Sequence, residues 1–491
     1  MFRVTFLGHQ GWLVSTGDTN ILIDPLLTAS FGHGGGAGTL YPPRSLDVAG
    51  FPEVDAVVFT HEHDDHFDVP SLNRLDRQIP IYLSARASTA GNALVSAMGF
   101  ETVRSLAADD THALGSLRYR TFAPEHAHGT ASDEWEVFPF VLFDVNGHGS
   151  MASSIDVAPP PALLDALQTL PTRSGLWCHA NNATCAPFAD LTGQTANARG
   201  DGVHIARAVV QRHRQVAHAW GSPAATLLCG GGWSYEGERA WMNTNAFPVS
   251  CATLAHTVAA QLGSAPVFAP LPGESYTLRD GAIAERSPHR PFIQAAAQGT
   301  WPEREYQGDV SVMPATGPAC GRATPTSQER RRMVDALKPY AEYLYGGPMF
   351  AGLYSLPSML PHGHRPAVCL ALRSGNGAVS RVLRYAPTEC AFVEETAADA
   401  LASPSQAFVS GLECWETDLL ALLEGRLAPS ALCHAGRMRV WNHLPEKTRA
   451  NIHDLWTFSH PLRRPTTTAK LYTKLLEAEP SHVPRVPGRV R

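Results

Sequence analysis

Short apolar runs separated by turn-forming residues open the chain. Residues 2–7, 12–15 and 20–25 are rich in Val, Ile, Leu and Phe, and the breaks between them contain Gly and Asp. Runs of this length with Gly and Asp between them are typical of β-strands joined by tight turns. The pattern therefore predicts an N-terminal β-meander.

Helical spacing then begins to alternate with strand-like runs. Residues 54–59 and 79–84 predict strands, and residues 70–77 and 88–98 have the apolar spacing of helices. Alternation of this kind is typical of an α/β domain. The same patterns predict further strands at residues 116–123, 137–145, 150–156 and 225–229, and a helix at residues 201–220.

The pattern changes near residue 286. Pro and Arg punctuate residues 287–325, and helix signals dominate afterwards. We therefore divide the chain into an α/β domain at residues 1–285 and a helix-rich α+β domain at residues 286–491. Helices of the second domain are predicted at residues 327–345, 398–424, 446–458 and 467–478.

Composition narrows the class of protein. The chain has 491 residues, 44% of them hydrophobic and 17% charged, which is typical of a globular protein. Its formal net charge is −6 without a basic stripe, which argues against a nucleic-acid partner. Nine cysteines without a paired spacing, no signal-like N-terminus and no run of about 18 apolar residues predict a cytoplasmic protein without a membrane partner.

The richest polar motif is Thr-His-Glu-His-Asp-Asp-His-Phe-Asp at residues 60–68. On an extended segment, side chains two apart lie on one side, which brings together His61, His63 and Asp65. A tight turn would then bring His66 beside them. Imidazole and carboxylate ligands suit zinc, iron(II) or manganese. The motif predicts a metal site.

Other residues near this motif have supporting roles in our interpretation. Glu62 and Asp64 are expected to face outward or to support the ligands, and Asp68 is expected to cap a helix. Of the isolated histidines, His9 is the best further ligand candidate.

A dinuclear site needs ligands from elsewhere in the chain. Glu125, His126 and His128 follow a predicted strand, and at least one of them is a candidate ligand. Asp156 ends another strand, where its carboxylate could bridge two cations. His179 ends a third, and a ligand role there is weighed evenly against that of a loop histidine.

The motif preceded by an apolar strand, with Ile23-Asp24-Pro25 before it and Ser154-Ile155-Asp156 after it, resembles the metallo-β-lactamase superfamily. The resemblance implies an αββα sandwich with two metals at one edge. It implies that His61, His63 and a residue of the 125–128 group bind one metal. It assigns Asp65, His66, Asp156 and a late histidine to the other.

The late histidine is where this chain departs from that family. The strand at residues 225–229 is followed by Gly230-Gly231-Gly232 instead. Either His179 substitutes for the missing ligand, or the second metal has a different shell.

Dispersed stretches are also similar to metallo-β-lactamase-fold oxygenases of the CMP-N-acetylneuraminate hydroxylase kind. They include the segments at residues 7–13, 270–273 and 441–443. This similarity implies a non-haem di-iron monooxygenase of a small or carrier-bound metabolite, with a separate electron donor and with the C-terminal domain covering the site. The alternative is a hydrolase of an ester, lactone, amide or phosphodiester with two zinc or manganese ions, in which Asp65 manages the proton of a metal-bound water.

Overall fold

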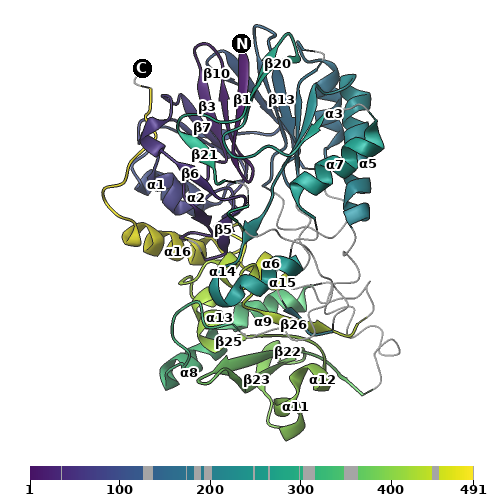
Figure 1. Cartoon of the computed structure of the whole chain (residues 1–491). Coiled ribbons are helices and arrows are strands. Elements are labelled where there is room, and N and C mark those ends of the chain that lie inside the picture. The colour runs from purple at the N-terminus through teal and green to yellow at the C-terminus, as the bar shows by residue number, and fades with distance from the viewer. Residues whose placement is uncertain are drawn as a thin grey trace.

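Two facing β-sheets form the first part of the molecule in the computed structural model (Figure 1). The structure describes residues 1–34, 36–124, 136–172, 174–181, 189–192, 202–246, 249–263, 266–297, 299–301, 316–347, 363–444 and 453–489. The first sheet has the order β20 (Ala282–Ser287), β19 (Ser275–Arg279), β1 (Phe2–Gly8), β2 (Gly11–Ser15), β3 (Asn20–Ile23), β7 (Ala56–Phe59), β8 (Ile81–Ser84) and β9 (Val103–Leu106). The second has the order β10 (Thr111–Leu114), β11 (Leu117–Thr121), β12 (Phe140–Asp144), β13 (Ser150–Ser153), β14 (Leu176–Ala180), β16 (Ala225–Cys229) and β18 (Val267–Phe268).

Helices cover the outer face of each sheet. The first sheet packs on α1 (Val69–Asn73), α2 (Thr89–Ala97) and α16 (Pro465–Ala478), and the second on α3 (Pro161–Gln168), α5 (Gly202–Trp220) and α7 (Cys251–Leu262). The inner faces share one apolar core that includes Val4, Ile23, Val58 and Leu227. This arrangement is the αββα sandwich expected for the metallo-β-lactamase fold.

The parallel strands bring their carboxyl ends to one edge. Strands β3, β7, β8 and β9 run parallel in the first sheet, as do β13, β14, β16 and β18 in the second. Asp68 caps α1, since its side chain accepts the Ser71 N–H. This confirms the predicted cap, which begins a helix directly after the histidine motif.

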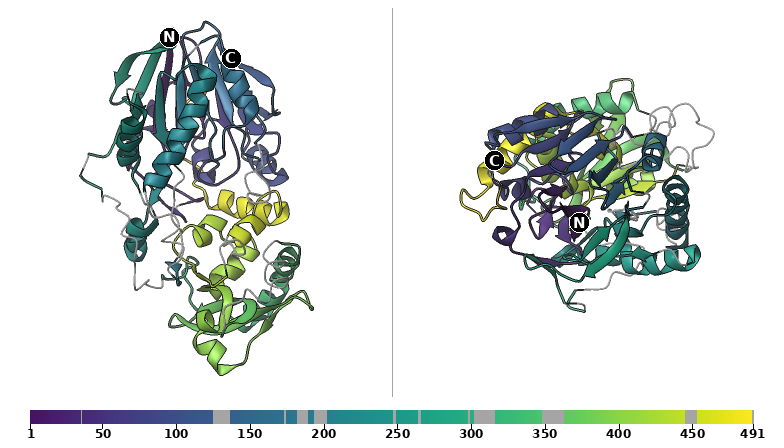
Figure 2. Two further views of the ribbon diagram at one scale, coloured as in Figure 1. Left: turned by 90° about the vertical axis from the view of Figure 1, so that its right-hand side faces the viewer. Right: turned by 90° about the horizontal axis from the view of Figure 1, so that it is seen from above.

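A third, six-stranded sheet lies between the helices of the second part (Figures 1 and 2). Its order is β15 (Ala189–Asp190), β26 (Arg439–Asn442), β25 (Phe408–Trp415), β22 (Arg365–Ser374), β23 (Ala378–Ala386) and β24 (Ala391–Glu394). One face packs on α8 (Ser327–Ala336), α9 (Lys338–Tyr345), α13 (Glu416–Leu423), α14 (Pro429–Cys433) and α15 (His453–Phe458). The other packs on α11 (Ala398–Ala402) and α12 (Pro404–Ala407).

The single helix predicted at residues 398–424 is wrong. The stretch forms α11, α12, the central strand β25 and α13. Every residue of β25 is buried. A strand buried on both faces has a continuous apolar sequence that periodicity does not distinguish from a buried helix, and Pro404 stops a helix from continuing into it.

The two parts are connected by more than one crossing of the chain. Strand β15 belongs to the third sheet, although it lies in the first half of the sequence. Helix α16 returns to α2, and the tail beyond it pairs at Leu75–Val486 and Val54–Gly488. The proposed boundary at residue 285 therefore stays a prediction. Among the helices that the described residues form, none combines the length and apolar character needed to cross a bilayer.

The third sheet generates a test of close packing. A Cβ on Gly411 of β25 would lie 2.3 Å from Trp441 Cζ2 and 2.6 Å from Cys369 O. We expect Gly411→Ala to lower the free energy of unfolding by about 1–3 kcal/mol, the usual cost of overpacking a core. Chemical denaturation measures it. Gly346→Ala is the control, because a Cβ at that position would lie 3.9 Å from its nearest neighbour, Tyr343 O. An equal loss of unfolding free energy in the two variants would contradict the close packing of Gly411.

Candidate metal centre

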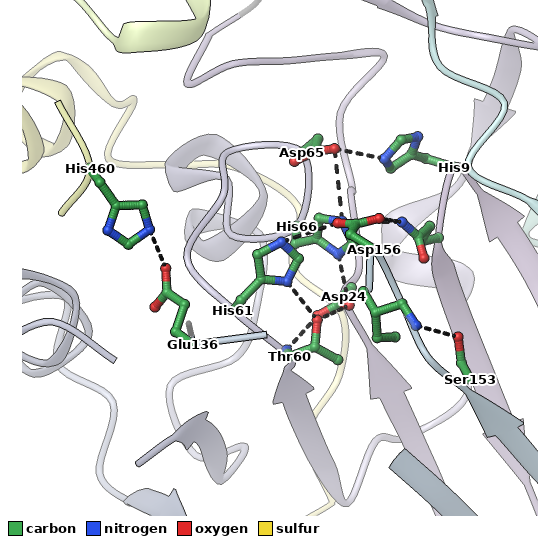
Figure 3. A network of polar contacts seen from close by, with 12 residues as sticks. His9, Asp24, Thr60, His61, Asp65, His66, Glu136, Ser153, Asp156 and His460 are labelled. Atoms are coloured by element: carbon green, nitrogen blue, oxygen red, sulfur yellow. Dashed lines mark hydrogen bonds and ion pairs between the residues drawn. The ribbon is translucent and has the colours of Figure 1, made fainter. Parts of the chain in front are cut away.

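The ends of four strands place the polar residues of the site. Strand β1 ends beside His9, β3 beside Asp24, β7 beside the histidine motif and β13 near Asp156. Because these ends share one edge of the sandwich, residues far apart in sequence meet there (Figure 3). The meeting of these residues follows from the shared direction of the strands. The apolar pattern predicted the strands themselves.

The histidine motif is folded into a turn. The N–H groups of His66 and Phe67 donate to His63 O at 2.9 and 2.7 Å. The turn places the ring centroid of His61 4.5 Å from that of His63 and 4.1 Å from that of His66. The three imidazoles therefore lie side by side, as the predicted turn requires.

Within the described part of the chain, three groups of side chains bring metal-ligand atoms within 4.8 Å of one another. The first contains His9, Asp65 and His66, and the second His61, His63 and Asp156. The third contains His63, Glu136 and His460. Each group combines two imidazoles with one carboxylate.

Asp156 lies between the first two groups. Its Oδ2 is 3.3 Å from His61 Nε2 and 3.2 Å from His66 Nε2. Gln10 Nε2 donates to the other carboxylate oxygen at 2.6 Å. A carboxylate that reaches an imidazole of each group has the placement of a bridging ligand.

Asp24 orients two of the histidines. Its Oδ2 accepts from the Thr60 hydroxyl at 2.7 Å and from His66 Nδ1 at 2.8 Å, and its Oδ1 accepts from Thr60 N–H at 2.8 Å. The Thr60 oxygen is in turn 3.0 Å from His61 Nδ1. Since the Thr60 proton is used on Asp24, His61 Nδ1–H must be the donor there. Both imidazoles then present Nε2 to the site, as in metalloproteins whose ligands are held by outer carboxylates.

Charge and burial oppose each other in this cluster. Burial, reinforced by His66, lowers the pKa of His61. Burial also disfavours a charged His66, but the surrounding carboxylates, Asp65 first, raise its pKa well above the ordinary value. Burial likewise works against ionised Asp156, yet His66 and His61 hold its pKa well below the usual range. The carboxylate is ionised in the protein, and bound cations would replace protons on the imidazoles.

The backbone is strained at three residues of the site. His9, Asp24 and Ile155 have φ of 53°, 44° and 53°. This region is costly for side chains other than Gly, and for β-branched Ile above all. At Ile155 the bend follows β13 and precedes Asp156, and the Ile155 N–H donates to Ser153 Oγ at 3.0 Å. The strain turns ligand candidates towards the cluster.

Two carboxyl groups of the motif support neighbouring elements. Glu62 accepts from Ser88 N–H at 2.5 Å and from the Ser88 hydroxyl at 3.0 Å, beside the start of α2. Asp64 accepts from the Ser430 hydroxyl in α14. Both are buried, and burial raises the pKa of Glu62 to about 8 and that of Asp64 to about 7. Of the two roles expected for them, the structure favours support over an outward position.

The remaining predicted ligands lie elsewhere. Glu125, His126 and His128 fall outside the described residues. His179 is buried, and it belongs to none of the three groups. It stands two residues from Trp177, which packs beneath α5, and burial followed by Arg212 of α5 lowers its pKa to about 3. The imidazole therefore lies on the helix-covered face of the sheet.

Sequence reasoning did not single out Gln10, Glu136 or His460. Gln10 stands beside His9, so its position after β1 was a usable signal. Glu136 precedes β12. A carboxyl group just before a buried strand is a weaker sequence signal of a ligand than the position of Gln10. His460 is nearly 400 positions from the motif, and no local pattern marks it.

The donor atoms of the described residues fit a metal centre. Imidazole nitrogens and carboxylate oxygens converge from separate elements, and buried clusters of this kind are costly without a compensating charge. His61, His63 and Asp156 would hold one cation, and His9, Asp65 and His66 the other. Asp156 would contact both.

A family model for the β-lactamase superfamily domain matches residues 19–151. That segment contains β3, the whole histidine motif and β12. Residues 19–151 form a β-lactamase superfamily domain. Together with the ligand groups, this family indicates a dinuclear metal site and a metal-dependent enzyme.

Curated relatives match a shorter part. UPF0173 metal-dependent hydrolases from two strains of Thermus thermophilus are 37% identical over 67 residues, which is 14% of this chain. The matched segment spans 25% of the length of these relatives. The similarity therefore covers a short segment of each chain.

Solved structures share the fold at low identity. A possible metal-dependent hydrolase from Veillonella parvula is 16% identical with a TM-score of 0.36, and the match covers 57% of this chain and all of that one. CmlA, a diiron β-hydroxylase from Streptomyces venezuelae, is 14% identical with a TM-score of 0.34, covering 57% and 54%. At these identities and TM-scores, neither match supports a conclusion about the reaction of this chain.

The role of Asp24 in this superfamily domain can be tested by metal affinity. Asp24→Asn replaces an acceptor by an amide that donates, so the orientation of His61 and His66 is lost. We expect the affinity for the more weakly held cation to fall about 10–100-fold, the usual effect of losing an outer carboxylate. Competition with a chelator measures it.

Asp55→Asn is the matched control. Asp55 is also buried, and it accepts from Asn20 N–H at 2.8 Å at the opposite end of β3 and β7. Equal loss of metal affinity in both variants would show a general effect on stability instead.

Proposed function

We propose that the chain is a non-haem di-iron monooxygenase that hydroxylates a small or carrier-bound metabolite. One oxygen atom of O₂ enters the substrate and the other leaves as water, with two electrons and two protons from a separate donor. When bound, the iron ions supply the electron-transfer chemistry that activates O₂.

The observation that carries the proposal is the composition of the ligand groups. Each combines two imidazoles with one carboxylate. Two histidines and one carboxylate with open positions are typical of iron(II) oxygenases. After β16, the described residues continue with Gly230-Gly231-Gly232, where hydrolases of the resembled family have a histidine. This departure from the hydrolase ligand set favours the oxygenase over a hydrolase.

The residues divide into holding and positioning roles. His61 and His63 would hold one cation, His9, Asp65 and His66 would hold the other, and Asp156 would contact both. Asp24 orients the imidazoles, and Gln10 fixes one oxygen of Asp156 at 2.6 Å. The side chain of Asp65 is 25% exposed, which leaves it reachable by a substrate proton.

A hydrolase with two zinc or manganese ions is the second candidate. Two histidines with a carboxylate also occur in catalytic zinc sites, where the metal lowers the pKa of bound water to about 7. The Thermus relatives are named metal-dependent hydrolases. In this reading Asp65 accepts the proton of the attacking water.

Metal analysis separates the two candidates. Metal-free protein loaded without oxygen in separate preparations with iron, zinc or manganese should hold two ions per chain, because direct competition would favour zinc whatever the reaction. Addition of a reductant and air should start O₂ uptake in the iron-loaded protein alone, measured with an oxygen electrode. Asp156→Asn should lower that uptake more than about 100-fold, because the bridging charge is lost. Absence of O₂ uptake by the iron-loaded protein, with turnover of a generic ester or phosphodiester by the zinc- or manganese-loaded protein without O₂, would overturn the oxygenase proposal.

A further inference from the structure

The third ligand group joins the two parts of the molecule. His63 comes from the histidine motif and Glu136 from the segment before β12, whereas His460 follows α15 in the C-terminal part. His460 Nε2 lies 3.1 Å from Glu136 Oε1 (Figure 3). Its ring centroid lies 5.7 Å from that of His63. Neither Glu136 nor His460 belongs to the histidine motif.

The protonation of His460 follows from its other nitrogen. Leu462 N–H donates to His460 Nδ1 at 3.2 Å. A nitrogen that accepts a hydrogen bond carries no proton, so the proton of the neutral ring is on Nε2. That Nε2–H faces the Glu136 carboxylate. His460 Nε2 is thereby in contact with Glu136 Oε1 at 3.1 Å, and a metal at the same nitrogen would need the proton removed.

Glu136 and Glu62 play different roles in the same dry pocket. Glu62 is occupied by the Ser88 N–H and hydroxyl. Glu136 is fully buried, is hydrogen-bonded to Glu62, and also lies with His63 in a ligand group. A buried carboxylate is costly unless it is paired with a positive charge, and a neutral imidazole supplies only a hydrogen bond. A cation at His63 would supply the missing charge.

The space beside these side chains suits a small ion. A cavity of about 30 Å³ lies between the two parts, and Glu62, His63 and His460 line it among others, whereas Glu136 does not. That is room for a water molecule or a cation beside His63. The Trp456 ring lies 5.6 Å from that of His63 on the side of the C-terminal part.

We propose that His460, from the C-terminal part of the chain, positions the Glu136 carboxylate as a ligand of the cation held by His63. His460 is a positioning residue that acts through Glu136. The metal centre of the superfamily domain is then complete only when the C-terminal part is in place. This inference rests on the metal centre of the proposed function, and it does not depend on whether the reaction uses O₂.

The test compares two amides at one position. The terminal NH₂ of glutamine in His460→Gln can occupy the place of Nε2, whereas that of asparagine in His460→Asn is one bond too short. With cobalt(II) as the probe, we expect His460→Gln to stay within about threefold of the wild-type affinity. His460→Asn should lose about 10–100-fold at one of two sites. Visible absorption of bound cobalt and calorimetry measure the site and the affinity.

Two further variants make the comparison decisive. Glu136→Gln should show the same loss as His460→Asn, and the double variant should lose no more, because the residues act as one unit. His443→Ala is the control, since His443 is a C-terminal histidine whose Nε2 lies 2.8 Å from the Ser405 carbonyl. It should bind two cobalt ions normally.

Each outcome has a defined meaning. Wild-type affinity in His460→Asn, equal loss in the two amide variants or additive losses with Glu136→Gln would overturn the proposal. Absence of cobalt binding by the wild type would overturn both this proposal and the proposed function. If cobalt affinity depends on His460 but the iron-loaded protein consumes no O₂, this inference is supported and the oxygenase proposal is rejected.

Discussion

The metal centre depends on the hydrogen bonds that Asp24 accepts. Its two oxygens take the Thr60 N–H, the Thr60 hydroxyl and His66 Nδ1 at 2.7–2.8 Å. These contacts join β3 to β7 at the edge where their carboxyl ends meet. They also determine which nitrogen of two imidazoles faces the cations. One buried carboxylate thus connects strand pairing to metal binding, and the strained backbone at Asp24 (φ 44°) is tolerated where this connection is made.

The sequence predicted most of the sandwich, because its signals are local. Strands such as β7 and β16, and the cap at Asp68, follow from runs and turn residues within a few positions. The histidine motif indicated a metal site for the same reason, since its ligands lie within one turn. Prediction failed at β25, where a strand buried on both faces has no period-two pattern.

Ligands contributed across long distances in sequence are not accessible to such reasoning. His9 was recognised only as the best of the isolated histidines, and the structure brings its Nε2 to 3.0 Å from Asp65. Glu136 and His460 come together only through the packing of the two parts, so no local sequence pattern marks them as ligand candidates. His179 carries an imidazole, as many metal ligands do, but strand alternation directs this side chain to the face covered by α5. Which face a strand residue occupies is a matter of register, and one position decides it.

The C-terminal part is joined to the metal edge by polar contacts that are too specific for a passive cover. The Ser430 hydroxyl donates to buried Asp64, and His460 meets buried Glu136. Gly36 lies so close to α14 that a Cβ on it would come within 2.7 Å of Ala431 Cβ. The first two contacts give buried carboxyl groups of the superfamily domain a polar neighbour, and the third requires glycine at position 36. Removal of the C-terminal part would leave two buried carboxyl groups without their partners, which costs more than the loss of apolar surface alone. These contacts therefore tie the C-terminal part to the superfamily domain at the edge of the sandwich where the ligand groups lie.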